Sequence, residues 1–182
     1  MAIWISSLAL APGIAEKHRV SKVVSLLSPY DSFPSFSNLG PDCHLQVGIH
    51  DINDDIGEWE APKMDDAERV IRFVETWDRS APILIHCWAG ISRSTASAFI
   101  TACVHNPATD EEDIAQAIRA ASPTAYPNRR LVSHADALLG RNGRMSKAVE
   151  AIGRGQISEE AHPFSIPSSY GDKTGKTPGK SK

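Results

Sequence analysis

Short apolar runs alternate along this chain with longer segments in which apolar residues recur at helical spacing. The apolar runs predict strands over residues 2–6, 20–27, 45–49 and 83–85. The helical spacing predicts helices over residues 65–77, 94–105, 109–121, 130–139 and 144–152. Strands that alternate with helices are typical of a single α/β domain, so we expect a central, mostly parallel sheet of four to five strands flanked by helices.

Turn and capping residues separate the predicted elements. Pro12 and Gly13 are expected to break the chain after the first strand. Thr109 and Glu112 have the spacing of a capping box and predict the start of a helix. The third strand is followed by an acidic loop, residues 51–62. Loops that follow parallel strands gather at one edge of the sheet, where ligands of such domains bind.

The C-terminal part differs from the rest in composition. From about residue 155 the periodic pattern fades, and residues 171–182 are Gly, Lys, Ser, Thr and Pro with a single aspartate. Such composition does not supply enough apolar surface to order a segment. We therefore expect a domain over residues 1–154 and a flexible tail over residues 155–182.

Overall composition narrows the functional classes. The chain has 182 residues, 41% hydrophobic and 23% charged, as in ordinary globular domains. The formal charge of −3 argues against a nucleic-acid partner, and no apolar run is long enough to predict a membrane span. The three cysteines suggest no disulfide framework, which favours a cytoplasmic location, and the seven histidines show no metal-ligand spacing.

The most informative segment is the loop at residues 86–94, between the strand at 83–85 and the helix that follows. The loop carries a cysteine, Cys87, and an arginine, Arg93. Free N–H groups and the helix dipole make such a place suited to phosphate, and the same field stabilises a thiolate. An arginine there can bind two phosphate oxygens at once.

The loop resembles the His-Cys-x5-Arg-Ser/Thr signature of the cysteine-dependent protein tyrosine phosphatase superfamily. The fixed positions are matched by His86, Cys87, Arg93 and Ser94, with a typical Ala-Gly-Ile filling. The resemblance implies a phosphatase-like fold and catalysis without metal or cofactor. The mid-chain position of the loop and the size of the chain favour the compact dual-specificity type.

The resemblance also implies roles for individual residues. Cys87 would be the nucleophile that forms a cysteinyl-phosphate, and Arg93 would hold the phosphate oxygens. Ser94 would assist departure of the Cys87 sulfur, and His86 would hold local geometry. The backbone of the loop would bind the phosphate, through residues Trp88, Ala89, Gly90, Ile91, Ser92 and Arg93. Trp88 either walls the substrate pocket or packs against a neighbouring loop.

Two further positions complete the expected site. The general acid is expected on the loop after the third strand, where Asp51 is favoured over Asp54 and Asp55 because it directly follows the strand. Pro127-Asn128 is similar to a pair that in this superfamily begins the helix behind the phosphate loop. Asn128 would then support that loop, although an ordinary helix cap fits it equally well.

These features predict a protein phosphatase that acts on phosphotyrosine, with phosphoserine and phosphothreonine as further substrates. The alternatives are a phosphatase of a non-protein ester such as a phosphoinositide, a non-catalytic phosphate-binding adaptor, and a sulfurtransferase that uses a loop cysteine. The uncharged side chains of the loop disfavour a highly anionic inositol substrate. Retention of both the cysteine and the arginine disfavours the adaptor.

Overall fold

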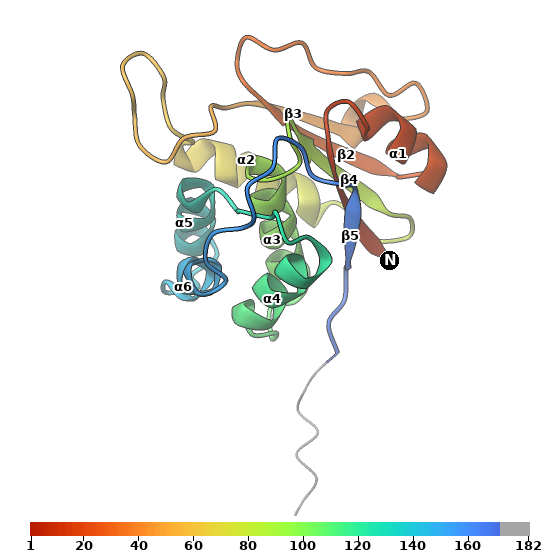
Figure 1. The fold of residues 1–182 in the computed structure, drawn as a ribbon. Coiled ribbons are helices and arrows are strands. Elements are labelled where there is room, and N and C mark those ends of the chain that lie inside the picture. The colour runs from red at the N-terminus through yellow and green to blue at the C-terminus, as the bar shows by residue number, and fades with distance from the viewer. Residues whose placement is uncertain (172–182) are drawn as a thin grey trace, which may run out of the picture.

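The computed structural model describes residues 1–171, and its core is one five-stranded sheet with the strand order β3-β2-β4-β1-β5 (Figure 1). The strands are β1 (Ala2–Ser7), β2 (Lys22–Leu27), β3 (His44–Gly48), β4 (Ile83–Cys87) and β5 (Phe164–Pro167). The pairs β1–β4, β4–β2 and β2–β3 are parallel, and β5 pairs antiparallel with β1. The predicted α/β class, with a mostly parallel sheet, is confirmed.

The helices are distributed unequally over the two faces of the sheet (Figure 1). They are α1 (Ala11–His18), α2 (Met64–Glu75), α3 (Arg93–His105), α4 (Glu111–Ala121), α5 (Arg129–Leu138) and α6 (Arg144–Ala151), with a short 3-10 turn η1 (Pro41–Cys43). Helix α1 covers one face with Ala11 packed near Val23 and Leu84. The larger core lies on the other face, against which α2 to α6 pack.

Both faces of the sheet are covered by helices because the strands carry apolar side chains on each face. In β4, Ile83 and Ile85 belong to the larger core, whereas Leu84 between them belongs to the cluster under α1. A strand buried on both faces reads as a continuous apolar run, which is the pattern seen in the sequence. Helix α3 lies deepest, because every residue from Arg93 to Cys103 is buried. The loop that joins β4 to α3 is therefore held between two buried elements.

Two local predictions are wrong. Pro12 and Gly13 do not break the chain but lie in the first turn of α1, where proline is tolerated because that turn has no intrahelical acceptor for its N–H. The cap of α4 is Asp110 rather than Thr109, since the Asp110 carboxylate accepts a hydrogen bond from the Glu112 N–H at 2.9 Å.

The expected boundary at residue 154 is too early for the sheet. Residues 155–163 lead to β5, which pairs with β1 as the edge strand of the sheet. Its side chains Phe164 and Ile166 are buried. The Ser168 N–H donates to the Met1 carbonyl at 2.9 Å, which extends the pairing. A four-residue edge strand with only two buried apolar side chains is too short to show a clear period. The rest of the expected tail, residues 172–182, lies outside the described residues.

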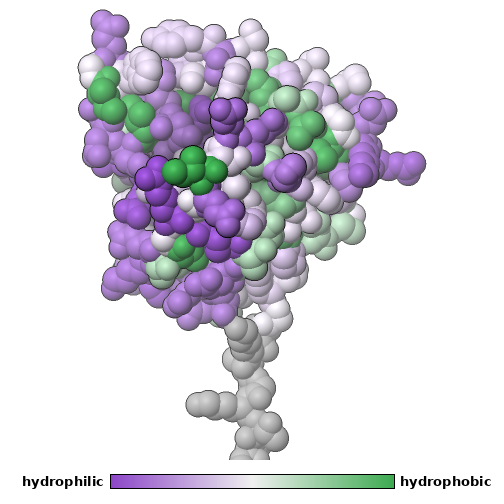
Figure 2. Space-filling view, viewed as in Figure 1, coloured by the Kyte–Doolittle hydropathy of each residue, from purple (hydrophilic) through white to green (hydrophobic). Residues whose placement is uncertain are grey.

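The face seen in Figure 1 is largely hydrophilic, with separate hydrophobic side chains between charged ones (Figure 2). Among residues 1–171, no helix is long and apolar enough to cross a membrane.

Candidate active site

Cys87 is the last residue of β4, at the edge of the sheet where the parallel strands end. It is 1% exposed, and its Sγ lies 3.1 Å from the Ser94 Oγ in the first turn of α3. A thiol at the carboxyl end of a central strand lies where α/β domains bind their ligands. The strand and the helix thus bring the two predicted side chains into contact.

The loop between them has the form of an anion cradle. Within residues 1–171, none of the backbone N–H groups from Trp88 to Ser92 donates a hydrogen bond to another protein group. The carbonyl oxygens of Trp88, Ala89 and Ile91 are instead bonded to N–H groups outside the loop at 2.9–3.1 Å, from Leu8, Ala161 and Tyr126. Successive free N–H groups at a helix N-terminus bind phosphate.

Gly90 is required by the geometry of this loop for two independent reasons. Its φ is +75°, in the left-handed region that favours glycine. A Cβ at this position would lie 2.8 Å from the Ser6 carbonyl carbon and 2.9 Å from the Ser7 nitrogen. The loop therefore packs directly on the backbone of β1.

Arg93 is 5% exposed, and its guanidinium is only partly used by the protein. Its Nη1 donates to the Ile49 carbonyl at 2.9 Å, which fixes the direction of the side chain. Its Nε has no hydrogen-bond partner within the described residues and lies 3.7 Å from the Asp51 Oδ2. The Nε side of the Arg93 guanidinium is thus left to donate hydrogen bonds to two oxygens of an oxyanion.

The three candidate acids occupy different environments. Asp51 adjoins the phosphate loop, where its Oδ1 accepts from the Ser92 Oγ at 2.6 Å. Asp55 accepts from the Ala61 N–H at 2.7 Å and so closes its own loop. Asp54 is exposed and makes no hydrogen bond or ion pair in the described part of the chain. Only Asp51 of the three contacts the predicted site.

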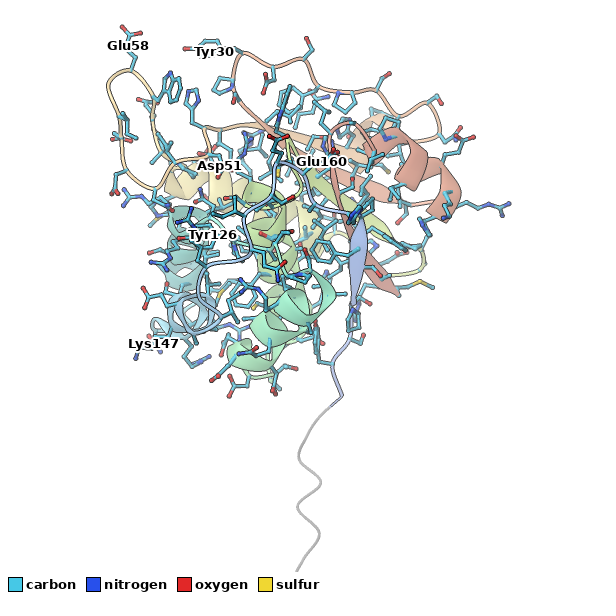
Figure 3. All side chains as sticks on the ribbon, viewed as in Figure 1. Tyr30, Asp51, Glu58, Tyr126, Lys147 and Glu160 are labelled. Atoms are coloured by element: carbon cyan, nitrogen blue, oxygen red, sulfur yellow. The ribbon has the colours of Figure 1, made fainter. Side chains whose placement is uncertain are left out.

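Asn128 connects the phosphate loop with the acidic loop. As the cap of α5, its Oδ1 accepts from the Leu131 N–H at 3.0 Å, while its backbone N–H donates to the Ser92 carbonyl. Its Nδ2 donates to the Asp51 Oδ1 at 3.1 Å and to the Ile52 carbonyl at 3.2 Å. The sequence left a cap and a support as alternatives, and the side chain makes both sets of contacts. Asp51 and Tyr126, on either side of this junction, lie at the same end of the molecule (Figure 3).

His86 is buried behind the loop and is neutral near pH 7. Burial lowers its pKa to about 4, and the charges of His44 and Arg93 act in the same direction. Its Nε2 lies 2.6 Å from the Ser25 Oγ, which is 2.7 Å from the His44 Nε2. Sequence reasoning missed Ser25 and His44, because Ser25 is set opposite His86 only by the parallel pairing of β2 with β4, which the sequence does not display.

Trp88 is 60% exposed, although its backbone is tied to the β1–α1 connection. It lines a surface pocket together with Leu8, Ala9, Ala89, Glu159 and Glu160. The side chain is therefore not covered by a neighbouring loop. It forms one wall of a hollow that begins at the residue after Cys87.

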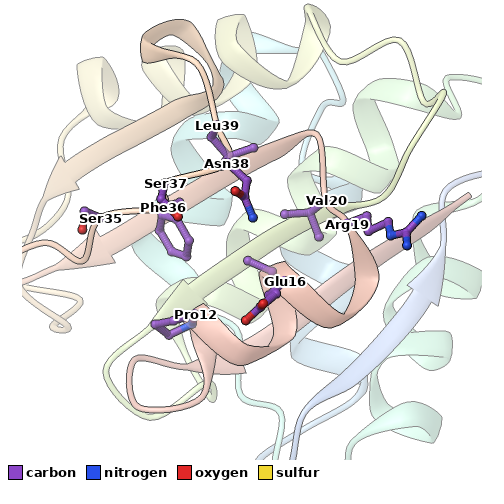
Figure 4. A pocket seen from close by; sticks show the side chains of 10 residues that line it. Pro12, Glu16, Arg19, Val20, Ser35, Phe36, Ser37, Asn38 and Leu39 are labelled. Carbon is purple, nitrogen blue, oxygen red and sulfur yellow. The ribbon is translucent and has the colours of Figure 1, made fainter.

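A separate groove lies on the other side of the sheet, between α1 and residues 35–39 (Figure 4). Its lining includes Phe36, whose ring meets the His44 ring edge-on at 4.9 Å. None of the predicted site residues lines it. Among the described residues, no cluster of three His, Cys, Asp or Glu side chains is arranged to hold a metal.

Comparison with known proteins supports the resemblance seen in the sequence. The protein-tyrosine phosphatase family model matches residues 57–124, which contain the whole loop at 86–94. The structure of DUSP15 is 18% identical with a TM-score of 0.59, and the likeness covers 86% of this chain and 92% of that chain. Human DUSP28 is 18% identical, with a TM-score of 0.58 over 76% of this chain and 94% of that chain.

A third similar structure is PTPMT1 in complex with PI(5)P, which is 14% identical with a TM-score of 0.55 over 81% of this chain and 91% of that chain. At these identities the structures show a shared fold. No curated protein sequence matches the chain. The family model thus agrees with the family that residues 86–94 resemble, and the solved structures agree with the fold.

Proposed function

We propose, from the resemblance of residues 86–94 to the cysteine-dependent protein tyrosine phosphatases and from the family model that matches residues 57–124, that this chain removes phosphate from phosphotyrosine in proteins, and also from phosphoserine and phosphothreonine. The observation that carries the proposal is the cradle of unused N–H groups from Trp88 to Ser92 with the Cys87 sulfur at its base. A nucleophile there faces the phosphorus of any phosphate held by the loop.

In the first step the Cys87 thiolate attacks phosphorus and the bond from phosphorus to the leaving oxygen breaks. The product is a cysteinyl-phosphate. Asp51, in its protonated form, gives its proton to the departing oxygen, so that the alcohol or phenol leaves neutral. The contacts of Asp51 with Ser92 and Asn128 hold the carboxyl group beside the loop for this transfer.

Stabilisation of the transferred phosphoryl group falls to the loop and to Arg93. Free N–H groups bind the equatorial oxygens, and the free edge of the guanidinium binds two of them at once. Because Arg93 is already oriented by the Ile49 carbonyl, little reorganisation is needed when charge develops. Donors that are preorganised in this way usually supply most of the rate enhancement in such reactions.

In the second step a water attacks the cysteinyl-phosphate. Asp51, now a carboxylate, takes the proton from that water, and the bond from phosphorus to sulfur breaks. The sulfur departs as a thiolate beside the Ser94 hydroxyl, which at 3.1 Å can donate a hydrogen bond to it. Inorganic phosphate then leaves the loop.

A protein substrate is favoured over a polyanionic lipid headgroup. The loop offers a single buried guanidinium, and its other side chains, from Trp88 to Ser92, are uncharged. The PI(5)P complex of PTPMT1 is a property of that protein, and the likeness of 14% identity extends only to the fold. A monoester with one phosphate matches the charge that the cradle provides.

The test is hydrolysis of p-nitrophenyl phosphate and of a phosphotyrosine peptide by the reduced protein in EDTA. We expect turnover by the wild-type chain and none by Cys87→Ser, which keeps the loop but lacks the thiolate. Cys103→Ser is the matched control, because that thiol is buried in the core and away from the loop. Absence of turnover by the wild-type protein, or its persistence in Cys87→Ser, would overturn the proposal.

A further inference from the structure

The pocket beside the phosphate loop contains a feature that the phosphatase reaction does not use. Two glutamates, Glu159 and Glu160, line this pocket together with the exposed Trp88. Within residues 1–171, neither carboxylate forms an ion pair with a lysine or arginine of the chain. Trp88 and Ala89, which line this pocket, belong to the loop at residues 86–94, so the pocket adjoins the proposed phosphate site.

The pocket is held together by contacts between segments that are distant in sequence. The Leu8 N–H donates to the Trp88 carbonyl, and the Ala161 N–H donates to the Ala89 carbonyl. The Ser7 hydroxyl donates to the Glu160 carboxylate. The segment before β5 is thereby fixed against the phosphate loop, and Glu160 lies at the upper end of the sheet in Figure 3.

We propose that this pocket receives a lysine or arginine side chain located next to the phosphorylated residue of a protein substrate. The inference rests on the proposed phosphatase function and names the class of phosphoprotein on which it acts. A basic side chain has an aliphatic stem that packs on apolar surface and a cationic head that stays in water. Here the stem would lie against Trp88, and the head would meet Glu159 and Glu160.

Charge and ring chemistry select this occupant. An arginine or lysine over a tryptophan face is attracted by the ring, most strongly among the aromatic residues. The two carboxylates, which form no ion pair within residues 1–171, add charge complementarity, which sets specificity more than raw affinity. The same carboxylates repel an acidic peptide or a headgroup with several phosphates. The pocket therefore selects among monoesters that the phosphate cradle alone would accept equally.

The expected size of the preference is moderate. Exposed ion pairs and cation–π contacts each change equilibria by a factor of a few, so together they predict about tenfold. We expect kcat/KM for a phosphotyrosine peptide with arginine at one neighbouring position to exceed that of the alanine peptide by about tenfold. Because the carboxylates are exposed, the preference should shrink as the salt concentration rises.

The experiment compares a set of phosphotyrosine peptides in which one arginine is moved through the positions on either side of the phosphorylated residue. Glu159→Gln with Glu160→Gln removes both charges, yet a glutamine oxygen can still accept from the Ser7 hydroxyl. The double variant should lose most of the arginine preference while keeping turnover of p-nitrophenyl phosphate. Glu58→Gln is the matched control, since Glu58 is an exposed glutamate outside this pocket, on the acidic loop. It should keep the full preference.

The outcomes separate the two proposals. Turnover of p-nitrophenyl phosphate without any arginine preference, or with a preference that survives in the double variant, would overturn the pocket assignment and leave the phosphatase proposal intact. Faster hydrolysis of a phosphoinositide than of the best arginine peptide would also overturn it. If the wild-type protein releases no p-nitrophenol, both proposals fall.

Discussion

The floor and the rim of the proposed active site are built in opposite ways. The floor, residues 86–94, lies between a buried strand and a buried helix, and His86, Cys87 and Arg93 are all at most 5% exposed. The rim includes residues 51–62, a loop that is mostly exposed and holds its shape through a few side-chain contacts such as Asp55 to Ala61. Chemistry that must be preorganised resides in the floor, whereas the rim can vary without loss of the fold.

The largest expected effect comes from changing the floor's cation. Arg93→Lys keeps the charge but loses the fork, so only one oxygen can be bound at a time. We expect kcat to fall by about 10³- to 10⁴-fold, which is about 4–5.5 kcal/mol of barrier. Steady-state kinetics on p-nitrophenyl phosphate measures this. Arg130, in the first turn of α5, is the control. Arg130→Lys keeps the backbone N–H that donates to Asn53 of the rim, so we expect kcat to change less than twofold. A lysine variant within tenfold of wild type would show that bidentate binding does not matter here.

Glycines in the floor and the rim offer a second comparison. Gly90 and Gly57 both have positive φ, +75° and +61°, but only at Gly90 would a Cβ meet backbone atoms under 3 Å. Gly57→Ala should cost about 1–2 kcal/mol of unfolding free energy, from the left-handed conformation alone. Gly90→Ala adds a backbone clash with β1, and we expect a loss greater than about 3 kcal/mol. Urea unfolding of the two variants checks this, and equal losses would mean that the loop can move away from β1.

The buried floor should also make stability depend on pH. His86 has its pKa lowered to about 4, whereas an unfolded histidine takes up a proton as pH falls through about 6.5. Between these values the unfolded chain binds the extra proton, so stability falls as pH decreases from 6.5 to 4, by about 3 kcal/mol for this residue. Above pH 6.5 both states are neutral and the effect is absent.

The measurement is urea unfolding at a series of pH values for the wild type and His86→Gln. The variant lacks the titration, so its stability should fall less steeply through this window. The carboxylates and His105, whose pKa burial also lowers, lie outside the hydrogen-bonded link from His86 through Ser25 to His44, so they contribute to both curves and cancel in the difference. Parallel curves for the two proteins would contradict the buried, neutral state of His86.

The floor could be predicted from sequence more completely than the rim. A strand, a loop with fixed cysteine and arginine positions, and a helix are consecutive in the chain, so local pattern specifies them together. The sequence favours Asp51 over the other two candidates for the general acid only because it directly follows a strand. Its contacts with Ser92 and Asn128 join segments 41 and 77 residues apart, and no local pattern carries that information.

Sequence patterns do not predict the elements and contacts that depend on pairing between distant segments. Strand β5 is completed only by pairing with β1, at the opposite end of the chain, so its four residues gave no reliable period. The link from His86 through Ser25 to His44 depends on the order β3-β2-β4, which the sequence does not display. Glu159 and Glu160 line a pocket with Trp88 and Ala89 for a similar reason: the segment before β5 is bonded to the loop through the Ala161 N–H and the Ala89 carbonyl, which lie far apart in sequence.

The smallest of the expected effects identifies which aspartate of the rim is the general acid. Asp51→Asn keeps an oxygen that can accept from Ser92 and Asn128, but it cannot give a proton. We expect kcat on a phosphotyrosine peptide to fall about 10²-fold, because the tyrosine oxygen, with a pKa of about 10, needs protonation to leave. On p-nitrophenyl phosphate the loss should be smaller, since that leaving group is stable as an anion.

The variant should also lose the limb of the pH profile on which kcat falls as pH rises, because that limb reports deprotonation of the acid. Asp54→Asn removes the same charge from the same loop without touching the phosphate site, and it should leave kcat, the profile and the ratio of the two substrates unchanged. A loss that depends on the leaving group in Asp54→Asn, and not in Asp51→Asn, would transfer the role to Asp54. It would also mean that the rim takes a different conformation over the floor when substrate binds, because Asp54 as it lies makes no hydrogen bond or ion pair with the loop at residues 86–94.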